Sequence, residues 1–157
     1  MSDSPQTPIL HVAADQDRFG ERHSLGISRI DFKLTPNDGD GILIIENTFH
    51  ARGGPARHLH HEQDEWFCAI EGEFIFEVGV HKYHLKPGDS LLGPRGVPHV
   101  WAFIGEERGK ILIAFMPAGH MEAFFRTVTQ ANAMPQQDPA LWRAHGMELV
   151  GPPLAFD

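Results

Sequence analysis

Short runs of β-favouring residues, separated by turn residues, make up most of this chain from Gly26 onward. The breaks carry turn chemistry, for example Pro36-Asn37-Asp38-Gly39 and Lys86-Pro87-Gly88-Asp89. Short strands at this spacing predict an all-β fold, either an antiparallel sandwich or a small barrel. The strands are expected at residues 27–33, 42–49, 66–70, 74–78, 83–85, 90–92, 99–104 and 111–116.

The hydrophobic period changes near the C-terminus. Apolar residues recur at helical spacing from Met121 to Val128 and predict an amphipathic helix over residues 119–131. A second short helix is expected to begin at Asp138-Pro139, which offers an N-cap and a first-turn proline, and to end before Gly146. We expect both helices to pack on the outer face of the β-domain or on a partner subunit, with their aromatic side chains serving packing.

These changes of pattern divide the chain into three segments. Residues 1–25 form a polar arm, with one short ordered piece expected around residues 9–12. Residues 26–117 carry the strands, and residues 118–157 form a helical tail packed on them. A chain of 157 residues has the size of one domain that can bury its own core.

Composition narrows the set of partners and compartments. The formal net charge of -8 argues against nucleic acid or an anionic membrane surface as a partner. The single cysteine, Cys68, rules out an intramolecular disulfide and suggests a reducing compartment. The N-terminus has no apolar stretch of signal-peptide length, and the longest apolar run, residues 111–116, is too short to cross a bilayer. We therefore expect a cytoplasmic protein that does not bind membranes.

Three histidines and one glutamate have the spacing of a metal site. His58 and His60 point to the same face of an extended strand, whereas His61 points away and is expected in solvent or beside the site. Glu65 brings a carboxylate from the next strand, and His99 brings a third imidazole. This donor set suits one divalent transition metal ion, such as Fe(II), Mn(II), Ni(II), Co(II) or Zn(II), and leaves positions for water or substrate.

The same residues stand inside two motifs through which the chain resembles a cupin. Of the first motif, G-x5-H-x-H-x3-4-E-x6-G, the chain has His58, His60, Glu65 and Gly72, with Arg52 in the place of the leading glycine and Gly53 and Gly54 directly after it. Of the second motif, G-x5-P-x-G-x2-H-x3-N, it has Gly88, Pro94, Gly96 and His99, with Phe103 where the family usually has asparagine.

The resemblance is to small single-domain cupins of the quercetin-dioxygenase-like kind. It implies a jelly-roll barrel over residues 26–117 and a mononuclear metal-dependent dioxygenase that acts on a small aromatic or enolic substrate. It also implies a catalytic role for Glu65, which would be both a ligand and the base that takes the proton of the substrate. Because similar proteins pair through sheet faces or exchanged N-terminal strands, a homodimer is expected.

Strand parity from Glu65 and His99 indicates which side chains share the cavity with the metal. Phe67, Trp101 and Phe103 fall on the same faces and predict an aromatic, apolar substrate pocket. Phe103, in the place of the usual asparagine, would make this pocket drier.

The polar lining of the cavity depends on the register of the strand at residues 42–49. Glu46 and Thr48 face inward in one register and Asn47 in the other, because a shift of one residue exchanges the faces of a strand. The sequence leaves both registers open.

Two other functions are compatible with the same ligands. A non-redox isomerase, lyase or decarboxylase would use the ion only as a Lewis acid and would need polar side chains around its substrate. A metal-dependent module that binds a small ligand without turnover is the other alternative.

Overall fold

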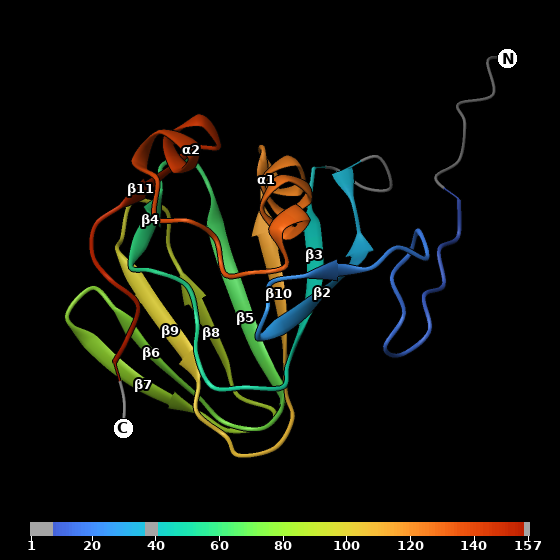
Figure 1. Ribbon diagram of the computed structural model, residues 1–157, viewed down its shortest axis with the longest axis horizontal. Coiled ribbons are helices and arrows are strands. Elements are labelled where there is room, and N and C mark those ends of the chain that lie inside the picture. The colour runs from blue at the N-terminus through green and yellow to red at the C-terminus, as the bar shows by residue number, and fades with distance from the viewer. Residues whose placement is uncertain (1–7, 37–40, 156–157) are drawn as a thin grey trace, which may run out of the picture.

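The computed structural model describes residues 8–36 and 41–155, and its centre consists of two antiparallel β-sheets packed against each other (Figure 1). One sheet has six strands in the order β1-β2-β3-β10-β5-β8, and the other has five in the order β11-β4-β9-β6-β7. The strands are β1 His23–Ser24, β2 Ser28–Leu34, β3 Leu43–Phe49, β4 His58–His60, β5 Asp64–Glu71, β6 Phe74–Val78, β7 His81–Leu85, β8 Ser90–Gly93, β9 His99–Phe103, β10 Gly109–Met116 and β11 Met147–Leu149.

This architecture confirms the all-β jelly-roll prediction. Each of the eight expected strands forms, with bounds that differ by at most two residues from those predicted. Three short strands lie outside these eight ranges, namely β1, β4 and β11; β4 is the extended strand assumed for His58 and His60, whereas β1 and β11 were not expected. Of these, β11 pairs with β4 and so joins the C-terminal segment to the five-stranded sheet. The ordered piece expected at residues 9–12 does not form a helix or a strand.

The core lies between the sheets and is rich in phenylalanine. Along β5 the inward side chains of Phe67 and Ala69 are fully buried, whereas Trp66 and Cys68 on the other face are half-buried. The rings of Phe74 and Trp101 pack edge-on against Phe49. Burial of one such ring stabilises a fold by roughly 1.5–3 kcal/mol, so this cluster is a main source of the stability of the barrel.

Phe103 closes the end of the barrel that lies away from the helices. Three glycines surround its ring, since a Cβ atom at Gly72, Gly105 or Gly109 would lie only 2.7, 2.6 or 2.4 Å from it. Gly72 also has φ +77°, a conformation that side chains rarely adopt. The aromatic residue at the usual asparagine position is therefore part of the core, and the expectation that it dries the pocket wall is wrong.

A close contact between the backbone at Gly54 and β9 accounts for glycine at this position before the first histidine. Gly53 forms an isolated bridge with Phe103, which brings the backbone at Gly54 against β9. A Cβ atom at Gly54 would lie 1.9 Å from the carbonyl oxygen of Trp101. Only glycine permits this approach.

The helices lie over the opposite, open end of the barrel (Figure 1). They are α1 Met121–Val128, the 3-10 turn η2 Thr129–Ala131, and α2 Pro139–Ala144. As predicted, the Asp138 side chain caps α2 by accepting a hydrogen bond from the backbone N–H of Ala140. Contrary to the expectation of outer-face packing, both helices turn buried side chains into the barrel interior. Within the described residues, no helix is both long and apolar enough to cross a membrane.

Candidate metal centre

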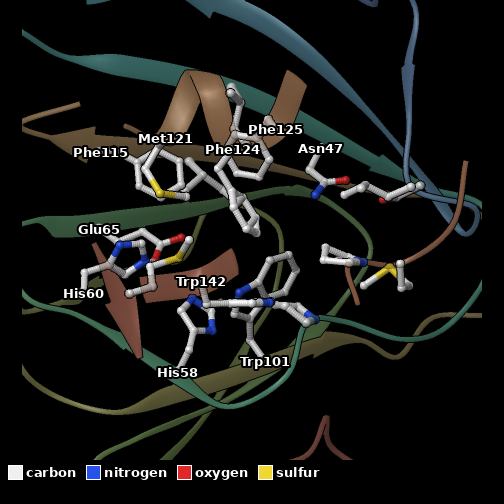
Figure 2. A pocket seen from close by; sticks show the side chains of 18 of the residues that line it. Asn47, His58, His60, Glu65, Trp101, Phe115, Met121, Phe124, Phe125 and Trp142 are labelled. Atoms are coloured by element: carbon white, nitrogen blue, oxygen red, sulfur yellow. Dashed lines mark ion pairs between the residues drawn. The ribbon is translucent and has the colours of Figure 1, made fainter. Parts of the chain in front are cut away.

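The four predicted ligands meet at the end of the barrel that the helices cover, and Figure 2 shows three of them, His58, His60 and Glu65, at the wall of the cavity. His58 and His60 alternate along β4 with Leu59 between them, and His58 pairs directly with His99 on β9. Glu65 reaches the same point from β5 in the opposite sheet. One ligand atom of each residue lies within 4.8 Å of those of the other three. Their exposed fractions are 5%, 1%, 4% and 1% for His58, His60, Glu65 and His99.

The donor atoms have the separation and the lack of partners that suit a shared cation. The Oε2 atom of Glu65 lies 3.0 Å from Nε2 of His60 and 2.9 Å from Nε2 of His99. These contacts are not aligned as hydrogen bonds, and all three atoms are buried without a hydrogen-bond partner. Adjacent donors that are each about 2.1 Å from one ion lie about 3 Å apart in octahedral geometry. The residues therefore fit a divalent transition metal ion.

Two of the histidines are oriented by hydrogen bonds from their other ring nitrogen. Nδ1 of His58 lies 2.7 Å from the carbonyl oxygen of Ala56, and Nδ1 of His60 lies 2.9 Å from Oε1 of Gln63. Since both partners are acceptors, each Nδ1 carries the proton and each Nε2 is left free for a metal. Gln63 in turn donates to the carbonyl oxygens of Pro117 and Ala118, at 3.0 and 2.5 Å. Sequence reasoning missed Gln63.

The charge of the cluster also suits a cation. Burial favours a higher pKa for Glu65, but His60 and His99 outweigh it and hold this pKa well below its usual range. Burial, together with the neighbouring His99 and His60, lowers the pKa of His58 to about 3. At neutral pH the site thus offers a carboxylate and at least one neutral imidazole.

Two polar residues next to the ligands in sequence, His61 and Asp64, face away from the site. His61 is exposed and lies 3.4 Å from Glu148, in agreement with its predicted orientation toward solvent. Asp64 accepts hydrogen bonds from the backbone and side chain of Arg95 at the surface. Neither side chain places a metal-binding atom near the four ligands.

A partly enclosed cavity of about 50 Å³ is lined by three of the predicted ligands, His58, His60 and Glu65. Its wall includes Trp101, as expected, but neither Phe67 nor Phe103, which are buried in the core farther along their strands. The register of β3 turns Asn47 into the cavity and leaves Glu46 and Thr48 on the other face. The helices contribute lining side chains that the sequence interpretation assigned to packing, namely Met121, Phe124, Phe125 and Trp142.

Comparison with known proteins agrees with this architecture. Residues 45–115 match a family model described as a cupin domain. The barrel has the cupin fold. An RmlC-like cupin from Shewanella frigidimarina superposes with a TM-score of 0.54 at 22% identity, over 73% of this chain and 96% of that one. KdgF from a Halomonas species superposes with a TM-score of 0.51 at 19% identity, over 57% of this chain and 77% of that one.

A relative is also found among curated proteins. The HTH-type transcriptional regulator PuuR of Escherichia coli (strain K12) is 26% identical over 117 residues, which are 73% of this chain. The match spans 59% of the length of the regulator. Together the findings support the cupin superfamily, and the quercetin-dioxygenase-like subtype stays a prediction.

Proposed function

We propose that this cupin is a mononuclear metal-dependent dioxygenase that acts on a small enolic or aromatic substrate. The observation that carries the proposal is a cluster of four buried donors, three of which, His58, His60 and Glu65, line a mostly apolar cavity. Such a cavity can admit an organic molecule beside the ion and limits the access of bulk water to it.

Under this proposal, four residues of the chain bind the metal ion and one of them also accepts a proton. His58, His60, Glu65 and His99 would hold the ion. A bound transition metal ion supplies a Lewis-acidic and redox-active centre with positions left open. Glu65 lines the cavity with an unpartnered carboxylate oxygen and is the group of this chain that can accept the proton of an enol.

The size of the cavity favours small substrates. A cavity of about 50 Å³ is roughly a third of the ~150 Å³ that accommodates benzene in an engineered protein interior. Binding of an enolic or aromatic substrate therefore requires side chains at the cavity wall, such as Met121 and Phe124, to move. Met121 is well suited to such movement, because its side chain is unbranched and adapts its shape.

A second candidate is a metal-dependent ligand-binding module without turnover. It is favoured by the similarity to a protein named as a transcriptional regulator and by the helix side chains that line the cavity. A non-redox isomerase or lyase of sugars or keto acids has less support, since beside the ligands the wall offers few polar groups.

Metal analysis combined with oxygen uptake tests the proposal. Protein purified without added metal should contain close to one equivalent of a transition metal. With acetylacetone or catechol, it should consume one dioxygen per substrate, because a dioxygenase places both oxygen atoms in the product. Binding of these molecules without oxygen uptake would favour the ligand-binding module instead.

Glu65→Gln separates the two roles of the carboxylate. Glutamine keeps the size and a neutral oxygen donor, so much of the metal should remain, whereas the rate should fall by roughly 10²–10⁴-fold if Glu65 is the base. Equal losses of metal and rate would mean that Glu65 is only a ligand.

A further inference from the structure

The cavity has a polar spot on its wall that the metal ligands do not account for. Asn47 on β3 and Ser28 on β2 both line the cavity and are 5% and 1% exposed. Oδ1 of Asn47 and Oγ of Ser28 are buried without a hydrogen-bond partner. Figure 2 shows the Asn47 amide pointing into the cavity from the wall opposite His58.

The strand pairing explains why these two groups belong together. Asn47 pairs with Ile30 on β2, and Ser28 pairs with Phe49 on β3. Asn47 and Ser28 are therefore diagonal neighbours on the inner face, a separation that still allows both to contact one ligand. On the other side Asn47 pairs with Ile111 of β10. The residues directly opposite Asn47 on both neighbouring strands are thus apolar.

An unsatisfied polar group of this kind is costly. A buried carbonyl or hydroxyl without a hydrogen-bond partner destabilises the fold, and buried polar groups in native proteins are nearly all paired. An amide carries both a donor and an acceptor, so Asn47 can meet either a hydroxyl or a carbonyl of a ligand. A bound ligand that supplies the missing hydrogen-bond partner would explain why Asn47 and Ser28 are buried at this wall.

We infer that Asn47 and Ser28 form a subsite that recognises a second polar group of the substrate, at a distance from its metal-binding oxygens. The substrate class is then a small enolic molecule with an apolar middle and a hydroxyl or carbonyl at its far end. This inference rests on the proposed function, because it assumes that the other end of the molecule binds at the metal.

Matched β-diketones test the subsite by binding rather than by turnover. The probes are propionylacetone and glycoloylacetone, which differ by a terminal methyl or hydroxyl, and the longer pair butyrylacetone and hydroxypropionylacetone. Binding to Co(II)-loaded protein is followed by the visible spectrum of the ion. For at least one pair, the wild type should bind the hydroxylated member about tenfold more tightly, as expected for one buried hydrogen bond.

Asn47→Leu should abolish this preference, and Ser28→Ala should reduce it. The matched control is Thr48→Val, since the Thr48 hydroxyl is also buried and unpartnered but lies on the outer side of the same strand. Thr48→Val should leave the preference intact. Equal binding of both members of each pair to the wild type, or a preference that survives Asn47→Leu, would overturn the subsite while leaving the proposed function standing. If no diketone perturbs the Co(II) spectrum, both proposals are wrong.

Discussion

Gln63 offers the sharpest test of how the metal centre is built. Gln63→Leu keeps the size of the side chain but removes the acceptor for Nδ1 of His60 and the donor for the two backbone carbonyls. Loss of a hydrogen-bonded partner behind a metal-binding histidine typically costs 10–100-fold in metal affinity. We therefore expect the dissociation constant for Co(II) to rise by about that factor, measured by titration against a competing chelator.

The same substitution should also destabilise the metal-free protein. It leaves two buried groups unpaired, Nδ1 of His60 and the carbonyl oxygen of Ala118, at roughly 1–3 kcal/mol each. At about 2–4 °C per kcal/mol for a domain of this size, the melting temperature should fall by at least about 4 °C.

Gln63→Glu separates the two effects. A carboxylate still accepts from His60 but cannot donate to Pro117 and Ala118, so metal affinity should be kept while stability falls. Gln130→Leu makes the same change at an exposed position and should alter neither quantity. If folded Gln63→Leu binds Co(II) as tightly as the wild type, the orienting role of Gln63 is wrong.

Three further predictions concern the ligands, their protonation and the assembly. His99→Ala should lower the metal occupancy measured by elemental analysis, whereas His61→Ala, at an exposed position, should leave the occupancy unchanged. The reverse result would contradict the assigned ligands. Burial lowers the pKa of His60, but Glu65 and Gln63 outweigh burial and raise this pKa above its usual value. A metal must therefore displace a proton from His60, and Co(II) affinity should increase as the pH rises through neutrality. His58, with its pKa lowered to about 3, should add nothing in this range, and a flat profile would refute the assignment. We also propose that the protein forms a homodimer through the outer face of the six-stranded sheet, where Trp66 is half-buried. Trp66→Arg should then convert the dimer to a monomer in a sedimentation experiment. A wild-type protein that sediments as a monomer would contradict this proposal.

The ligands could be predicted from the sequence because strand periodicity is local. Two residues on one strand necessarily share a face, so His58 and His60 could be assigned together, and His61 could be set aside, without knowledge of the partner strands. The same alternation correctly predicted which side chains of β5 face the interior of the barrel.

Periodicity gives the face of a side chain but not its depth in the barrel. Phe103 shares a face with His99, yet four residues at about 3.3 Å each place it about 13 Å farther along the strand. The pattern could therefore predict that Phe103 is buried but not that it lies at the closed end. The helix from Met121 presents the same difficulty, because an amphipathic period shows that one face is apolar and not what that face covers.

Tertiary hydrogen bonds decide what the sequence cannot show, and two buried amides illustrate this. Gln63 has its side-chain oxygen and nitrogen both bonded to distant parts of the fold, whereas the Asn47 oxygen has no partner. The first amide is thus part of the folded structure, and the second is available to a ligand. Replacing each by leucine in the metal-free protein should affect stability differently, with a lower melting temperature for Gln63→Leu and an unchanged or higher one for Asn47→Leu. A comparable loss in both variants would mean that Asn47 serves the fold and that the polar spot in the cavity needs another explanation.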